Sequence, residues 1–185
     1  MTTAKSRTWA LAEAREVAQD LITLLRPMCE RIEVAGSVRR KRPQVGDIEL
    51  VVVSKEAPST SLWLERPRLD ARTLELIGVG ILNYRLNKNG HLAFGLKNKL
   101  LIHVPSGIHV DLFSTNMENF GMSWIVRTGP AEFNIKMMSR FISLGMRGHA
   151  YGGVTDQHGN ELPCPDEETV FHLLGWRYRP PEERG

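Results

Sequence analysis

The segment from Asp47 to Val53 constrains this chain more than any other. Its second half, Leu50 to Val53, is apolar and rich in β-branched residues, which is typical of a strand buried inside a sheet. Two acids, Asp47 and Glu49, stand at the head of this strand. Because side chains two apart on a strand share a face, we expect both carboxylates to project from the same side of the sheet.

Periodicity and turn residues predict the remaining elements. Apolar residues at helical spacing indicate an opening helix over 8–29, which should kink or stop at Arg26 because Pro27 disfavours a helical residue before it. Further helices are expected at 61–77, 132–144 and 166–174, and further strands at 31–35, 82–87, 91–96, 99–104 and 108–113. Asn89-Gly90 is typical of a hairpin turn between two of these strands.

This order of elements predicts an α+β fold, a mixed sheet with flanking helices followed by a small α/β subdomain. The composition changes near Asn116, so we expect one unit at residues 1–116 and a second at 117–185. A chain of 185 residues with 42% apolar content can bury a core without disulfides.

Composition excludes several classes of protein. Only Cys29 and Cys164 are present, without CxxC spacing, which argues against a disulfide framework or a zinc site. No stretch approaches the roughly 18 apolar residues of a membrane span, and the first residues lack a signal core. We therefore expect a soluble, cytoplasmic protein, a monomer without a membrane partner. The net charge of +3 permits a polyanionic partner without requiring one.

A phosphate-binding pattern lies just upstream of the two acids. Gly36 allows close approach of the backbone, Ser37 offers a hydroxyl and an N–H, and Arg40 offers a fork of donors that matches phosphate. A third acid, Asp111, lies in the strand expected at 108–113. If that strand pairs beside Asp47–Val53, three carboxylates converge, and oxygen ligands of this kind suit magnesium.

Each part of this pattern has an ordinary explanation. A Gly-Ser pair is usually only a turn, and acids in a strand more often face water or an arginine than a metal. The parts occur together and in order, however: a strand, Gly36-Ser37, Arg39-Arg40, a loop, and then acid-x-acid before an apolar strand. This combination favours a nucleotide-binding and metal-binding site over coincidence.

At these residues the chain resembles the nucleotidyltransferase superfamily, and specifically the family X polymerases typified by DNA polymerase beta. The matching positions in the first part are Gly36, Ser37, Arg40, Gly46, Asp47, Glu49 and Asp111. The resemblance continues through Thr128-Gly129, Phe133-Asn134, Tyr151 and residues 168–178 with Pro180, which look like that family's thumb. The implied architecture is a catalytic palm with a nucleotide-gripping thumb.

The resemblance also implies roles for individual residues. Asp47, Glu49 and Asp111 would be catalytic and would hold two Mg²⁺ ions, for which Mn²⁺ could substitute. The nucleotide-binding residues would be Gly36, Ser37, Arg40, Gly46, Val126, Arg127, Gly129 and Asn134. The basic residues Arg39, Lys41 and Arg42 would contact DNA. The implied reaction joins a nucleoside triphosphate to a primer 3′-hydroxyl and releases pyrophosphate, as in a small gap-filling repair polymerase.

The chain departs from the family pattern in four places. Glu49 stands where a second Asp is usual, which predicts a different metal spacing or preference. Val126-Arg127 replaces a Tyr-Phe pair, Met138 replaces an arginine, and His109 replaces a basic residue. A nucleotidyltransferase that works without a template, or on a protein or small molecule, therefore stays open as an alternative. So do a non-catalytic nucleic-acid-binding derivative and a phosphate-binding regulatory domain.

Overall fold

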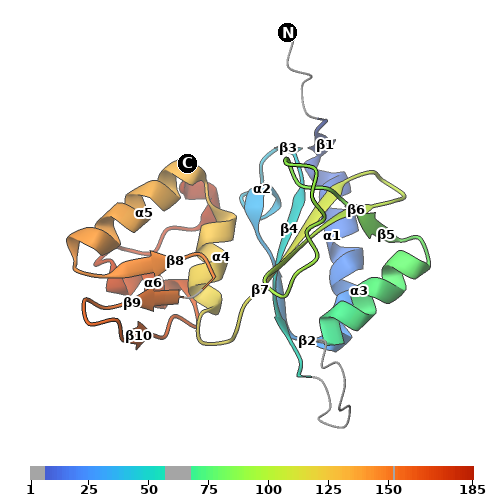
Figure 1. Ribbon diagram of the computed structural model, residues 1–185. Helices are drawn as coiled ribbons and strands as arrows, with labels where there is room; N and C mark the ends of the chain where they lie inside the picture. The colour runs from blue at the N-terminus through green and yellow to red at the C-terminus, as the bar shows by residue number, and fades with distance from the viewer. Residues whose placement is uncertain (1–6, 57–67, 152) are drawn as a thin grey trace.

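The computed structural model describes residues 7–56, 68–151 and 153–185. Its centre is a five-stranded mixed sheet in the order β2-β4-β7-β6-β5 (Figure 1). The strands are β2 (Cys29–Val34), β4 (Ile48–Ser54), β5 (Leu82–Tyr84), β6 (Asn98–His103) and β7 (His109–Ser114). β4 and β7 run parallel, and the other neighbours in the sheet pair antiparallel.

Two helices cover one face of this sheet, α1 (Leu11–Leu25) and α3 (Arg68–Gly78). They pack on apolar side chains that alternate along the strands, among them Ile48, Leu50 and Val52. The 3-10 turn η1 (Arg26–Met28) ends α1 where Pro27 predicts it. The loop before β4 contains α2 (Gly36–Arg39) and β3 (Gln44–Val45), and β3 pairs with β1 (Trp9–Ala10).

The C-terminal part forms a second apolar cluster. It contains α4 (Phe120–Thr128), α5 (Ala131–Ser143), α6 (Glu167–Leu173) and the 3-10 turn η2 (Pro181–Glu183). A small antiparallel sheet, β8 (Arg147–His149), β9 (Gly153–Thr155) and β10 (Glu161–Leu162), completes it. A third cluster joins the two parts, because Val51, Val53 and Phe113 of the large sheet pack on Phe120 of α4.

Several predictions are confirmed by these elements. The opening helix, the strand after it, the buried strand headed by the acids and the strand carrying Asp111 all form. The turn at Asn89-Gly90 also forms, where the Asn87 side chain accepts from the backbone N–H groups of Asn89 and His91. The division of the chain near Asn116 stays a prediction.

Other predictions need correction. Residues 91–96 form isolated bridges, Leu86 with Leu92 and Phe94 with Lys99, in place of the expected strand. Sequence reasoning missed α4, because six of its nine residues are buried between the sheet and the second cluster and none is exposed, so no solvent-facing stripe marks the helix. It also missed β8, β9 and β10. For the helix expected at 61–77, residues 61–67 lie outside the described ranges, and α3 accounts for the remainder.

Within the part of the chain that the structure describes, no helix is both long enough and apolar enough to cross a membrane.

Candidate active site

The three acids meet on the sheet face that looks toward α4. β4 and β7 pair in parallel register, with Glu49 directly opposite Asp111. Asp47 comes two residues before Glu49, at the entry to β4. The expectation that the two acid-bearing strands are neighbours is therefore confirmed.

Burial and mutual repulsion act strongly on these acids. Burial, together with the charges of Asp47 and Asp111, raises the pKa of Glu49 to about 8. Burial also raises the pKa of Asp47 and of Asp111 above their ordinary values, against the opposing charge of Arg85. The three carboxyl groups disfavour one another's charge, and a bound cation would relieve that repulsion.

Arg85 follows β5 and reaches the third acid. Its guanidinium forms an ion pair with Asp111, while its backbone N–H donates to the Leu100 carbonyl at 3.0 Å. Leu100 in turn pairs with Asp111 across β6 and β7. Arg85 and Asp111 are thus two strands apart in one row of the sheet. His109 also lies near Asp47, and its pKa is lowered chiefly by burial.

The acids are not arranged as a ready metal site. Among the described residues, no group of three or more His, Cys, Asp or Glu side chains is positioned to hold a metal ion. Asp111 is engaged by Arg85, and the Glu49 carboxylate packs against the Cα of Gly36. The donor chemistry fits a hard divalent cation, since carboxylate oxygens are its preferred ligands. The Arg85 guanidinium engages Asp111 Oδ1, so it would compete with such a cation for this carboxylate.

Gly36 is required by its neighbours as well as by its backbone. Its φ is +61°, a left-handed conformation that favours glycine. A Cβ at this position would collide with the Glu49 carboxylate. The close approach predicted at Gly36 is therefore an approach to a catalytic candidate. Gly46, by contrast, is exposed and has open space around its Cα.

The predicted phosphate cradle lies against the start of α5. Arg40 donates from Nη1 to the Thr128 carbonyl, and a Cβ on Gly129 would lie 3.2 Å from that nitrogen. Asn134 donates from Nδ2 to the Val126 carbonyl at 2.7 Å. Two separate stretches of sequence, 36–40 and 126–134, are thereby brought together. Burial lowers the pKa of Arg40, although the nearby Glu49 and Asp47 favour its charge.

Arg127 points between the two parts of the chain. Its guanidinium carbon lies 3.8 Å from the ring centre of Phe113 and 4.5 Å from that of Tyr151. Its charge also lowers the pKa of Glu49 and of Asp111 against the effect of burial. Arg127 is a fixed cation beside the acids.

Buried polar atoms without a hydrogen-bond partner concentrate at this place. Among the described residues, seven buried side-chain nitrogen or oxygen atoms lack a partner. Five of them belong to the site: Ser37 Oγ, Arg40 Nε, Arg85 Nε, Arg127 Nε and Asn134 Oδ1. Buried polar groups are normally paired, so such a concentration indicates a surface that completes its bonds with a polar ligand.

The basic run divides into different roles. Arg39 was expected to contact DNA, but it donates to Glu167 at 2.5 and 2.9 Å and to the Thr128 hydroxyl at 2.8 Å. Its guanidinium also stacks on Trp124 at 3.3 Å from the ring centre. Arg39 therefore joins the two parts of the chain, and its contact with DNA stays a prediction. Lys41 pairs with Glu182 at the surface, and Arg42 is exposed.

Sequence reasoning missed Arg85, Glu167 and Arg184. Glu167 is almost fully buried and also accepts from Arg184 at 2.6 and 2.7 Å. No local pattern indicates these pairings, because the partners lie 17 to 128 residues apart in the sequence. Only the strand order could have suggested Arg85, because Arg85 just after β5 and Asp111 on β7 both lie opposite Leu100 of the strand between them, β6.

Comparison with known families gives one match. Residues 123–185 match the family model described as the DNA polymerase beta thumb. The match covers about a third of the chain, including most of α4 and all of α5 and α6. It supports a relation to the polymerase beta-like proteins of family X and bears on the C-terminal part alone.

Proposed function

We propose that this protein is a metal-dependent nucleotidyltransferase that adds nucleotides to a DNA primer 3′-hydroxyl, as a small gap-filling DNA polymerase does. The thumb match supports a polymerase-related function, and the acids on β4 and β7 supply the chemistry that such a function requires. Residues 1–116 would form the palm and 117–185 the thumb.

One observation carries the proposal. Ser37 Oγ, Arg40 Nε and Asn134 Oδ1 are buried without partners on the two sides of the same junction, beside three mutually repelling acids. The donors of Ser37 and Arg40 match the oxygens of a triphosphate, the Asn134 oxygen can accept from a hydroxyl or amino group of the nucleotide, and the carboxylates match a metal ion that the triphosphate carries. A structural surface would pair these groups internally.

The proposed reaction forms a bond between the primer 3′-oxygen and the α-phosphorus and breaks the bond from that phosphorus to the bridging oxygen. Pyrophosphate leaves, and Asp111 would accept the hydroxyl proton. Ser37 and Arg40 would hold the triphosphate, Gly36 and Gly46 would give it backbone access, and Asn134 would face the nucleotide. Val126, Arg127 and Gly129 would also contact the nucleotide at this site.

The metal ligands would be Asp47, Glu49 and Asp111. Bound Mg²⁺ or Mn²⁺ would activate the hydroxyl and neutralise the triphosphate. The chain's own contribution is to gather the ligands and to keep Arg40 and Arg127 nearby, so that the charges balance when the nucleotide arrives. The guanidinium of Arg85, paired with Asp111 Oδ1, would compete with the metal ion for this ligand.

The test is primer extension. A labelled primer on gapped, recessed, nicked and single-stranded DNA is incubated with each triphosphate and with Mg²⁺ or Mn²⁺. We expect single-nucleotide addition on the gapped duplex that follows the template base. Asp47→Asn and Asp111→Asn should lose addition at unchanged circular dichroism. Full activity in either variant would overturn the assignment, and addition without a template would favour the template-independent alternative.

A further inference from the structure

A hollow in the C-terminal part of the chain has none of the three acids in its lining. It has a volume of about 630 Å³ and is lined by Phe133, Lys136, Gly175, Trp176, Arg177 and Arg179. The first two come from α5 and the others from the segment that follows α6, at the C-terminal end in Figure 1. Pockets of this size are typical of ligand sites.

The floor of this hollow is aromatic and fixed. Phe133 is buried, and its ring centre lies 6.1 Å from that of Trp176, edge to face. Trp176 is placed by the end of α6, where its backbone N–H donates to the Phe171 carbonyl at 2.9 Å. Tyr178 packs its ring on Phe171, and Arg177 and Arg179 on either side of it are exposed.

The rim is cationic and has no internal counter-charge. Lys136, Arg177 and Arg179 are exposed, and none forms a salt bridge with any carboxylate of the described residues. No acid lines the hollow either. The neighbouring Arg184 shows the contrast, because it is buried and paired with Glu167 while its Nε holds the Arg179 carbonyl at 3.0 Å. That bond fixes the backbone from which the Arg179 side chain extends.

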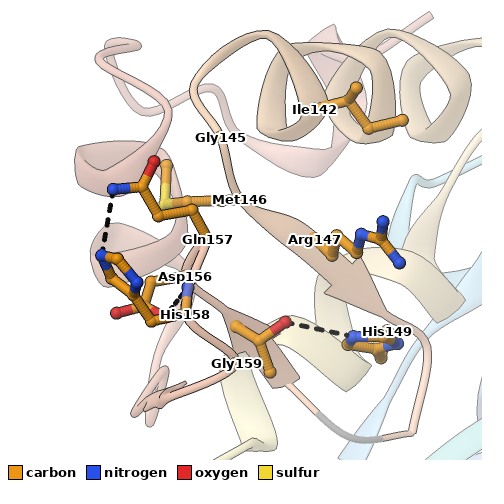
Figure 2. A pocket seen from close by; sticks show the side chains of 10 residues that line it. Ile142, Gly145, Met146, Arg147, His149, Asp156, Gln157, His158 and Gly159 are labelled. Atoms are coloured by element: carbon orange, nitrogen blue, oxygen red, sulfur yellow. Dashed lines mark hydrogen bonds between the residues drawn. The ribbon is translucent and has the colours of Figure 1, made fainter.

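The other large hollow of the thumb differs in chemistry. It lies between the end of α5 and the β8–β9 sheet, and its polar groups partly engage one another (Figure 2). His149 lies 3.4 Å from the Thr155 hydroxyl, and Gln157 lies 3.1 Å from His158. Asp156 also lines this hollow, and its carboxylate accepts from the backbone N–H groups of His158 and Asn160. A lone Arg147 beside an acid is a poor anion site.

We propose that the hollow formed by Lys136, Trp176, Arg177 and Arg179 binds a phosphate group of a nucleic-acid strand. Three cations without counter-charges match a phosphate, and arginine forks bind it with two parallel bonds. The aromatic floor suits the sugar or base attached to it. The inference rests on the proposed function, because the hollow shares α5 with Asn134, the residue proposed to face the nucleotide.

Two sources could supply the phosphate, the end of a strand or its internal backbone. The probes are fluorescent duplexes with a one-nucleotide gap whose downstream strand carries a 5′-phosphate or a 5′-hydroxyl, and a recessed duplex without that strand. Dissociation constants are measured without divalent ions, at several salt concentrations. The variants are Arg177→Ala, Arg179→Ala and Lys136→Ala, with Arg147→Ala as the matched control from the other hollow.

For a terminal phosphate we expect the wild type to prefer the phosphorylated gap by about tenfold and Arg177→Ala to remove that preference. For a backbone phosphate, each pocket variant should weaken binding to all duplexes alike and reduce the salt slope by about one. Arg147→Ala should change neither the preference for the phosphorylated gap nor the affinity and salt slope for the duplexes. Pocket variants that bind every duplex with wild-type affinity and wild-type salt slope would overturn the proposal.

The two proposals fail separately. Binding is measured without catalysis, so a protein that never extends a primer but loses phosphate recognition in Arg177→Ala would refute only the polymerase function. A protein that extends primers while all three variants bind normally would refute only the phosphate site.

Discussion

Arg85 pairs with Asp111 across an intervening strand, and this ion pair holds one of the three acids that a metal ion would need. Both side chains are largely shielded from solvent, so the pair is less screened than one at the surface. In the free protein the Arg85 guanidinium supplies the positive charge beside Asp111 that a metal ion would supply under the proposed function.

We predict that Arg85→Ala binds divalent ions more tightly than the wild type. Removing the competing guanidinium frees Asp111. The Kd for the divalent ion should therefore fall by roughly threefold or more, which corresponds to about 0.7 kcal/mol. Isothermal titration of Mn²⁺ into the free protein measures this without catalysis. Arg85→Lys keeps the charge and should stay near wild type. Weaker binding in Arg85→Ala would show that Arg85 orients Asp111 for the metal.

Gly36→Ala should lower the free energy of unfolding more than Gly80→Ala does. The left-handed backbone alone costs an alanine about 1 to 2 kcal/mol. Gly80 has φ +76° and open space around it, so Gly80→Ala reports that cost by itself. The collision with Glu49 should add roughly 1 to 3 kcal/mol at Gly36. Urea unfolding of both variants measures the difference.

The same pair of variants in a Glu49→Ala background completes the test. The excess cost at Gly36 should shrink once the carboxylate is gone, because the two residues are in contact. An excess that persists would place the clash elsewhere.

The core of the site could be predicted because its signals are local. The apolar strand behind Asp47 and Glu49 and the Gly36-Ser37 loop each lie within a few residues, and alternation on a strand fixes which side chains share a face. The pairing of β4 with β7 required only that two buried strands be neighbours.

What could not be predicted depends on distant contacts. Arg39 pairs with Glu167, which lies 128 residues away in the sequence. Nothing in the sequence distinguishes Arg39 from the exposed Arg42, three residues further on. All nine residues of α4 are buried or half-buried because it lies between two cores, so it lacks the exposed polar face by which surface helices are recognised.

Glu167→Gln should loosen the attachment between the two parts of the chain. Burial disfavours the Glu167 charge, but hydrogen bonds from Arg184 and Arg39 outweigh it and lower the pKa of Glu167. Neutralising it leaves two arginines without their counter-charge, at a cost of about 3 kcal/mol. We expect a fall in Tm of roughly 6 to 12 °C by calorimetry. The exposed neighbour Glu168→Gln serves as the control and should change Tm little.

The pH dependence of stability should carry the signature of Glu49. Its pKa is about 8 in the folded protein, against about 4.3 for an unfolded glutamate. Between these values the folded state binds more protons than the unfolded state, so stability falls as pH rises from about 5 to 8. Glu49→Gln should abolish part of that fall in EDTA, and the Tm difference between pH 5 and pH 8.5 measures it. The exposed Glu13→Gln should retain the wild-type slope, and a Glu49→Gln slope equal to it would refute this origin.

Arg40 should act on the nucleotide rather than on the primer. Its guanidinium lies beside Asp47 and Glu49 and donates to the Thr128 carbonyl. Arg42, two residues away, is exposed and has no ion pair among the described residues. A charge-assisted bond to phosphate is worth about 1.5 to 3 kcal/mol, so Arg40→Ala should raise the KM for the triphosphate by roughly ten- to a hundredfold. Arg42→Ala should instead weaken DNA binding and reduce its salt dependence, because an exposed cation outside the cradle meets the backbone. Single-nucleotide kinetics and DNA titrations on both variants separate the two roles. If Arg40→Ala weakened DNA binding and left the KM unchanged, the residues 36–40 would be a primer contact and the assignment of the triphosphate cradle would be wrong.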